Sequence, residues 1–245
     1  MKISKDQKAE NRRAVIDAAV ALIGDKGFKA ATMRQIARNA GLGEATIYNY
    51  FPTKEALVYA YYEDHMLACI EELKTVPQFE TFSLQEQLQT LFDASLNRYL
   101  AERTFVQETF RSVLLGASRD WVHIRPIRSA FLTAVQDMLA AAVEVGEIPD
   151  QVFQDLLGQL FMDAYIGVVI YWLNDRSDGF EHTSVLIDRG LDLTCALLKA
   201  GVANKVFDMA VFMFKTHILE KMDRLVRPLK KAVAVKRRFM EALDE

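Results

Sequence analysis

The sequence predicts an all-α protein with an N-terminal three-helix unit containing a helix–turn–helix and a larger C-terminal helical domain. Apolar residues recur at helical spacing along the 245 residues, of which 51% are hydrophobic. The 11 glycines and 5 prolines are few and separate these periodic segments. No segment combines the strict alternation and frequent turns that are typical of strands. The length suggests two domains.

The first helix is predicted to end at Gly27. Its core stripe consists of Val15, Ala18, Ala19, Leu22 and Ile23. Basic residues crowd its start, at Lys5, Lys8, Arg12 and Arg13. This start has two interpretations of equal weight. It is either an arm that touches a DNA backbone or minor groove, or a solvated terminus.

Residues 32–54 are predicted to form two short helices joined by a glycine turn. Thr32 and Gln35 have the spacing of a capping box. Gly41 suits the left-handed residue that ends a helix. Pro52 prevents continuation of the second helix, and Thr53 can cap a third. This punctuation is that of a helix–turn–helix, whose second helix is short enough to enter a major groove.

The polar residues of this segment match the chemistry of DNA. Hydroxyl groups and an ammonium group can donate hydrogen bonds to phosphate oxygens. The residues that carry them here are Thr32, Thr46, Tyr48, Tyr50 and Lys54. Arg34, Gln35 and Asn49 suit base edges. Glu44 suits cytosine N4 or only stabilises the helix start, Ala45 suits a thymine methyl, and Gly43 begins the second helix. The alternative is a structural module that binds no nucleic acid.

Charge supports DNA binding only locally. The chain carries −3 overall, but residues 1–60 hold ten basic and six acidic residues, a net charge of +4. Residues 61–202 carry −11, and residues 203–245 carry +4. A basic head on an acidic body directs one face toward phosphate. Ordinary scatter of surface charge remains an alternative.

Several motifs here resemble the TetR family of bacterial transcriptional regulators. They are AVIDAAVALIGDKGF, TMRQIARNAGLGEATIYNYF and the run from Tyr48 to Leu57 that contains Lys54-Glu55-Ala56-Leu57. The resemblance implies a homodimer that binds double-stranded DNA at a palindromic operator and leaves it when a small molecule enters the C-terminal domain. We therefore expect a helix–turn–helix DNA-binding domain in residues 1–55, a ligand-binding and dimerisation domain in residues 56–202, and an additional helical tail in residues 203–245.

Breaks in the apolar periodicity place the remaining helices. The expected ranges are 54–74, 83–101, 105–115, 126–145, 152–173 and 183–200, with a loop over 116–125. The 54–74 helix starts in the head and ends in the body, so it is the predicted mechanical link.

The helices at 152–173 and 183–200 are expected to form the homodimer interface as a four-helix bundle with their mates, as the corresponding pair does in the TetR family. The alternative is a pair of intramolecular core helices. The 152–173 helix is also long and apolar enough to span a membrane, but Gln159 and Asp163 within it are costly to place in lipid. We therefore expect no membrane partner.

A pocket for an unknown small-molecule effector is expected among the middle helices, because aromatic walls with a few polar groups are typical of such sites. Arg111, His123 and Arg125 suit an anionic ligand. The full expected lining is Tyr99, Phe110, Arg111, Trp121, His123, Arg125, Phe131, Met162, Tyr165 and Tyr171. Any of these aromatic residues is also compatible with an ordinary core position.

Enzymatic chemistry finds little support. The four histidines lack the spacing of metal ligands, and neither a phosphate-binding glycine motif nor a catalytic constellation can be placed. We expect no catalytic residue, cofactor or metal. Cys69 and Cys195 suit buried thiols, and no signal peptide is predicted, so a cytoplasmic location is expected.

The tail has a broad apolar stripe followed by basic residues. It is expected to pack on the body or on the partner subunit, although a basic amphipathic segment also suits a membrane surface or a protein groove. Taken together, the sequence predicts a ligand-released repressor. The alternative is a DNA-bound structural or protein-interaction factor of the same fold without an inducer.

Overall fold

The computed structural model describes residues 4–114, 116 and 121–213, without the side chains of Trp121 and Ala203. These residues are α-helical with short 3-10 and π segments, and they contain no strand, which confirms the predicted all-α class. They fall into two compact units. Residues 148–153 and the chain from Ala196 onward form one, and the remaining described residues form the other. The tail predicted beyond Met213 lies outside the described residues.

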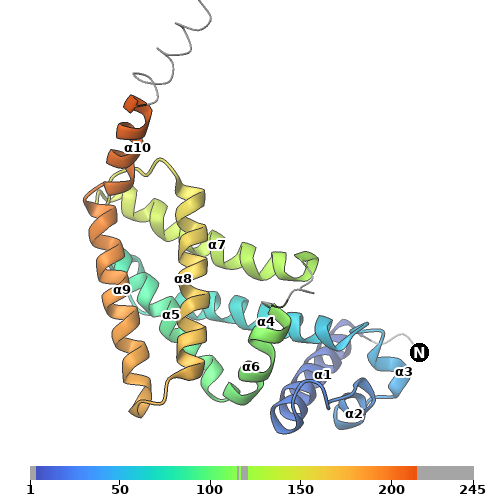
Figure 1. Ribbon diagram of the computed structural model, residues 1–245. Helices are drawn as coiled ribbons and strands as arrows, with labels where there is room; N and C mark the ends of the chain where they lie inside the picture. The colour runs from blue at the N-terminus through green and yellow to red at the C-terminus, as the bar shows by residue number, and fades with distance from the viewer. Residues whose placement is uncertain (1–3, 115, 117–120, 214–245) are drawn as a thin grey trace, which may run out of the picture. The chain divides into compact units, whose positions relative to one another are not determined.

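The N-terminal helices follow the predicted punctuation (Figure 1). They are α1 (Lys5–Lys26), α2 (Met33–Asn39) and α3 (Glu44–Ile47). Both halves of the Thr32–Gln35 capping box are formed, and Gly41 has a φ of +70°, the left-handed conformation that favours glycine. After Ile47 the chain continues in tight turns to Phe51, whose amide donates to the Ile47 carbonyl.

The linking helix α4 (Lys54–Leu73) begins directly after this head, and the Thr53 hydroxyl accepts from the Ala56 amide. A short 3-10 turn, η1 (Phe79–Thr81), leads to α5 (Leu84–Leu100), which opens with a capping box between Ser83 and Glu86. Within its unit, α4 packs against α1, α5 and α7. One helix therefore contacts both the head and the body.

The next segment departs from the expected boundaries. Helix α6 (Arg103–Thr109) changes into a π-helical turn, η2 (Phe110–Leu114), where a regular helix was predicted. Helix α7 (Trp121–Glu144) begins five residues before Pro126, so the prediction of a loop up to Arg125 was wrong for this part. Proline lacks the N–H for one helical hydrogen bond and usually marks a helix start. Here it lies within the helix, at the cost of that bond.

Two long helices and a shorter one complete the described chain. These are α8 (Gln154–Asn174), α9 (Glu181–Lys199) and α10 (Val202–Met213), with a 3-10 turn, η3 (Asp178–Phe180), between α8 and α9. Figure 1 shows α8 and α9 running in opposite directions. By length and composition alone α8 is able to cross a membrane, but 44% of its most apolar 18-residue stretch is buried within the protein.

The smaller unit is joined by Asn204 of α10. Its amide nitrogen donates to the Asp150 carbonyl at 2.6 Å, and its amide oxygen accepts from the Val152 amide at 3.1 Å. The rings of Phe153 and Phe207 meet edge to face with centroids 5.1 Å apart. These contacts attach the start of α10 to the segment before α8.

Asp175 organises the turn between α8 and α9. Its carboxylate accepts hydrogen bonds from the hydroxyl and amide of Thr183, at 2.6 and 2.9 Å, and from the hydroxyl and amide of Ser177, at 2.7 and 2.9 Å. The Thr183 hydroxyl bond is the main reason why the pKa of Asp175 lies well below its usual range. Four donors therefore fix the ionised form of this carboxylate at the start of α9.

We expect Asp175→Asn to lower the melting temperature by several degrees at neutral pH. Because the folded pKa is depressed, the stabilising effect of the carboxylate is fully present above the unfolded pKa of about 3.9 and disappears as the pH falls further. Melting curves from pH 7 to pH 2.5 should therefore show a constant gap between wild type and variant down to about pH 4 and a narrowing gap below it. The exposed Asp178, on the same turn, offers Asp178→Asn as a matched control, for which no such gap is expected. A gap as large at pH 2.5 as at pH 7 would contradict the role of the charge.

Candidate nucleic-acid interface and ligand cavity

The residues predicted to bind DNA lie on α2, on α3 with the turns after it, and at the start of α4. Seven are exposed and four are partly buried. The exposed ones are Thr32, Arg34, Gly43, Glu44, Ala45, Tyr48 and Asn49, and the partly buried ones are Gln35, Thr46, Tyr50 and Lys54. Tyr48 is 50% exposed, unusually high for an aromatic ring. The head thus presents a polar surface that includes an unburied tyrosine.

Arg34 and Glu44 connect the two helices of the motif. The Arg34 Nε lies 3.4 Å from a Glu44 carboxylate oxygen, and both side chains are largely exposed, at 82% and 56%. An ion pair this exposed contributes about 0–1 kcal/mol, so it opens at little cost when a stronger partner approaches. Sequence reasoning treated the two residues separately and missed this pairing.

Three more of the expected phosphate or base contacts have hydrogen-bond partners within the head. The Thr32 hydroxyl accepts from the Gln35 backbone amide at 3.3 Å, and the Gln35 side-chain oxygen accepts from the Thr32 backbone amide at 3.1 Å. The Tyr50 hydroxyl accepts from the Asn11 side-chain amide at 3.0 Å. These bonds fix the start of α2 and attach the end of the motif to α1.

Lys54 is held by the backbone of the head. Its ammonium donates to the carbonyls of Phe28 and Ala31, the latter at 2.6 Å, and lies 4.3 Å from the centre of the Phe28 ring. Partial burial lowers the pKa of Lys54. The sequence predicted a phosphate contact here, whereas the geometry directs the ammonium to the loop between α1 and α2.

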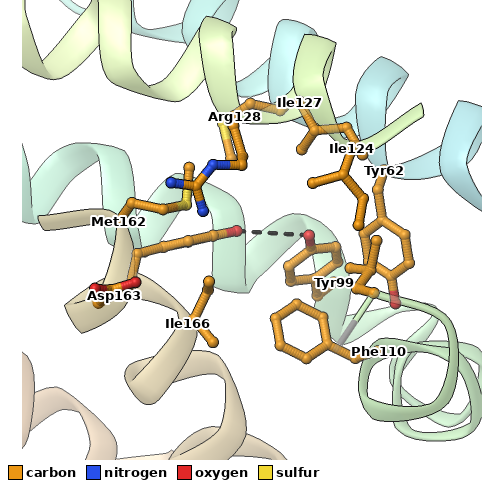
Figure 2. A pocket seen from close by; sticks show the side chains of 12 residues that line it. Tyr62, Tyr99, Phe110, Ile124, Ile127, Arg128, Met162, Asp163 and Ile166 are labelled. Atoms are coloured by element: carbon orange, nitrogen blue, oxygen red, sulfur yellow. Dashed lines mark hydrogen bonds between the residues drawn. The ribbon is translucent and has the colours of Figure 1, made fainter. Parts of the chain in front are cut away.

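A cavity of about 320 Å³ lies among α4, α5, η2, α7 and α8 (Figure 2). Four of the ten predicted lining residues line it, namely Tyr99, Phe110, Met162 and Tyr165. The remaining lining residues were not predicted, and they are Tyr62, Met66, Leu114, Ile124, Ile127, Arg128, Asp163 and Ile166. The walls are mainly aromatic and aliphatic, with one guanidinium and one carboxylate, as is typical of small-molecule sites.

The other predicted pocket residues lie elsewhere. Phe131 is fully buried and packs against the rings of Phe92 and Tyr165. Four more are exposed and do not line this cavity, and they are Arg111, His123, Arg125 and Tyr171. The His123 ring stacks on that of Tyr59, with centroids 5.4 Å apart. The side chain of Trp121 lies outside the described residues.

Among the described residues that line this cavity, Arg128 is the one with a cationic side chain. Its side chain extends from α7 toward α8, and the rings of Tyr62, Tyr99 and Phe110 lie on the opposite side of the space (Figure 2). It donates a hydrogen bond to the Gln159 side-chain oxygen. Among the described residues no carboxylate forms an ion pair with it. The sequence predicts a helix that starts at Pro126, which places Arg128 in its first turn. It therefore gives no indication that Arg128 faces a cavity.

A chain of buried polar groups reaches this cavity. The Tyr165 hydroxyl lies 2.6 Å from the Ser95 Oγ, which lies 3.0 Å from the His65 Nε2. The Tyr165 hydroxyl is also a donor to the Tyr99 hydroxyl at 3.5 Å. The His65 ring stacks flat on the Tyr99 ring at 3.7 Å, and burial lowers the pKa of His65 to about 3, so the ring is neutral. Over the described residues no group of three or more His, Cys, Asp or Glu side chains is placed to hold a metal.

Helix α4 connects the head to the cavity. Lys54 at its first turn holds the α1–α2 loop, while Tyr62 and Met66, two and three turns further on, line the cavity. A second connection runs through α6, where the Glu108 carboxylate accepts from the Phe28 amide at 3.3 Å, two residues before Phe110 at the cavity. Both connections converge on the loop that precedes α2.

Family models match both ends of this architecture. The model described as "Bacterial regulatory proteins, tetR family" matches residues 15–61, and the model described as "Tetracyclin repressor-like, C-terminal domain" matches residues 87–213. The chain is 23% identical to the fatty acid metabolism regulator protein of Bacillus subtilis over 200 residues, which span 81% of this chain and 99% of that protein.

Solved structures share the fold. FadR from Bacillus subtilis, in complex with stearoyl-CoA, has a TM-score of 0.60 at 22% identity, covering 77% of this chain and 98% of its own. FadR from Thermus thermophilus, in complex with lauroyl-CoA, has a TM-score of 0.57 at 22% identity, covering 78% and 94%. The relatives are regulators and not enzymes, and the helix–turn–helix, the helical body and the family models agree. The chain belongs to the TetR family of bacterial transcriptional regulators.

Proposed function

We propose that this protein is a homodimeric repressor that binds a palindromic operator in the cytoplasm and leaves it when an acyl-coenzyme A enters the cavity. The observation that carries the proposal is the double role of α4. One helix begins at the helix–turn–helix and supplies Tyr62 and Met66 to the wall of the cavity. A ligand in the cavity therefore contacts the same helix that packs against the helix–turn–helix.

An apolar surface on α8 and α9 supports the homodimer. We call it the α8–α9 face, and it consists of Leu156, Leu160, Tyr171, Val185, Leu186 and Leu193, each at least 40% exposed. A Cβ built on Gly167 or Gly190 meets nothing within 4 Å, so neither glycine is needed for packing within the chain. Exposed apolar surface of this kind marks an interaction site, and small residues allow two helices to approach closely. A second copy covers the face in our proposal.

The head supplies the operator contacts. In our proposal Tyr48 and Thr46 donate to phosphates, while Asn49 and Arg34 read base edges. Arg34 reaches a base after its exposed ion pair with Glu44 opens. Lys54 adds positive charge at this surface while its hydrogen bonds keep the loop before α2 in place. In a dimer the two recognition helices must lie about 34–36 Å apart, one turn of DNA, to enter successive major grooves.

The effector class follows from the cavity and the relatives together. The walls are largely apolar, which suits an alkyl chain, and the half-buried Arg128 offers a cation to the polar part of the ligand. Two structural relatives are in complex with stearoyl-CoA and lauroyl-CoA. A volume of about 320 Å³ is at the lower end of the roughly 300–1,000 Å³ of ligand sites, so the longest chains require the walls to move.

The proposed switch is a shift between two positions of α4. The effector must bind the released state more tightly than the DNA-bound state, since a ligand without that preference shifts nothing. An acyl chain between α4 and α8 displaces Tyr62 and Met66, and the displacement reaches Lys54 and the loop before α2 along the same helix. The heads then lose the spacing of successive grooves.

Selection of operator DNA from a random pool tests the DNA side of this proposal. We expect wild type to enrich a palindrome and Tyr48→Ala to bind that palindrome about tenfold more weakly, because one phosphate hydrogen bond is lost. The control is Leu67→Ala, on the exposed side of α4, for which unchanged affinity is expected. Enrichment of no palindrome by wild type would contradict the repressor. Unchanged binding by Tyr48→Ala would contradict only the contact.

Release of the operator tests the effector. Lauroyl-CoA is expected to dissociate the complex at micromolar concentrations, and free coenzyme A is expected to leave it intact because it lacks the chain. Fluorescence anisotropy of labelled operator measures both. If no acyl-CoA of any chain length releases DNA, the acyl-CoA effector is wrong, and the alternative of a DNA-bound factor without this inducer gains support.

A further inference from the structure

The cavity wall contains one buried hydroxyl whose hydrogen bond within the described residues is long. Tyr99 is only 2% exposed and lines the cavity (Figure 2). The dashed line that ends at the Tyr99 oxygen marks its hydrogen bond with the Tyr165 hydroxyl, which is 3.5 Å long. In the described part of the chain the Tyr99 hydroxyl has no shorter hydrogen bond. A buried donor without an acceptor is costly, and such groups usually have a partner.

The groups behind Tyr165 do not change this outcome. If the Tyr165 proton goes to Tyr99, the Ser95 hydroxyl donates to Tyr165, and Ser95 accepts from the neutral His65 ring. If the Tyr165 proton goes to Ser95 instead, Ser95 donates to a His65 ring in the other tautomer. In the second arrangement the Tyr165 oxygen can accept from Tyr99, but only over the same 3.5 Å, whereas the Tyr165–Ser95 and Ser95–His65 contacts are 2.6 and 3.0 Å long. In both arrangements the Tyr99 hydroxyl has no partner at a normal hydrogen-bond distance among the described residues.

Tyr62 shows what a fully satisfied tyrosine in the same wall looks like. Its hydroxyl lies 2.9 Å from the Thr109 Oγ1, and Thr109 donates its own proton to the Phe105 carbonyl at 2.8 Å. Tyr62 is therefore the donor of the pair, and its proton is committed within the protein. Two buried tyrosines line one cavity, and of the two only Tyr99 lacks a close hydrogen-bond partner among the described residues.

We propose that the Tyr99 hydroxyl donates a hydrogen bond to the thioester carbonyl oxygen of the bound acyl chain. The assignment rests on the proposed acyl-coenzyme A effector and names the atom that the cavity recognises. A carbonyl oxygen is an acceptor without a proton, so it complements a buried hydroxyl donor that has no close acceptor. The Tyr165–Ser95–His65 chain and the stacked His65 ring hold Tyr99 in place from behind. A purely apolar ligand leaves the Tyr99 proton without a close acceptor and binds more weakly for that reason.

Two ligands that differ at the carbonyl test the proposal. Lauroyl-CoA has the thioester carbonyl, and S-dodecyl-CoA replaces it with a methylene of the same chain length. By calorimetry with the full-length protein we expect wild type to bind lauroyl-CoA about tenfold more tightly than the thioether. In Tyr99→Phe the ratio should fall to about one. In Tyr62→Phe, the matched control in the same wall, the tenfold ratio should remain. Circular dichroism melting shows that each variant is folded.

The outcomes separate this inference from the proposed function. If wild type binds both ligands equally, or if Tyr99→Phe keeps the tenfold ratio, the carbonyl contact is wrong and the acyl-coenzyme A effector stands. If wild type binds neither ligand, the proposed effector itself is wrong, and the carbonyl contact falls with it. Loss of the ratio in Tyr62→Phe as well as in Tyr99→Phe would show a general change of the cavity and overturn the assignment to Tyr99.

Discussion

A single glutamate on the α8–α9 face is expected to convert the protein into a monomer that no longer holds its operator. Leu160 on α8 is 55% exposed and Leu193 on α9 is 61% exposed, so neither substitution disturbs the packing within one chain. In a symmetric dimer every substitution occurs twice. An uncompensated buried charge costs on the order of 3–5 kcal/mol, which corresponds to a dimer weakened by at least about 100-fold. Light scattering after size exclusion measures the mass of Leu160→Glu and Leu193→Glu.

The operator reports the same change independently. A monomer has one head, so it loses the joint binding of two half-sites and is expected to bind the palindrome at least about 100-fold more weakly. Val145→Glu is the control. Val145 is an equally apolar residue, 77% exposed, that lies just beyond the end of α7 and outside the α8–α9 face. If Leu160→Glu and Leu193→Glu remain dimers of full affinity, the two copies meet through another surface.

The head was the part of the fold that local sequence signals determine best. Thr32, Gln35 and Gly41 act over three or four residues, and the structure contains the capping box and the left-handed turn that they predict. The start of α7 differs from the prediction, because a proline usually marks the first turn of a helix and Pro126 lies inside this one. The sequence shows that a proline removes one helical hydrogen bond. It does not show the tertiary packing that compensates for the lost bond.

The site could be predicted less well for a related reason. Lys54 has the spacing of the family motif, but its carbonyl partners, Phe28 and Ala31, are more than twenty residues away in the chain. Whether an aromatic residue lines a cavity or fills the core depends on which helix it faces. Tyr99 and Phe131 both lie on the apolar side of their helices, yet only Tyr99 lines the cavity. Four of the twelve residues that line the cavity were among those predicted from the sequence.

Filling the cavity is expected to produce a repressor that binds DNA and ignores the effector. Ile166 of α8 is partly buried and lines the cavity, so the indole of Ile166→Trp extends into the space of the acyl chain. Displacing three to four methylenes of the chain removes about 3 kcal/mol of apolar burial, at ~0.8 kcal/mol each, and weakens the effector by about 100-fold. Operator affinity should stay within a factor of about three, because Ile166 lies on neither the head nor the α8–α9 face.

The contrast between the two measurements is what identifies the cavity as the effector site. A variant that merely unfolds loses DNA binding together with the ligand response, whereas a filled cavity removes only the response. Leu67→Trp adds the same indole to α4, one residue beyond Met66 of the cavity wall but at a position that is 51% exposed. It should bind operator and respond to lauroyl-CoA like wild type. Normal release of Ile166→Trp from DNA by lauroyl-CoA would place the effector elsewhere, and the link from the cavity through α4 to the head would lose its basis.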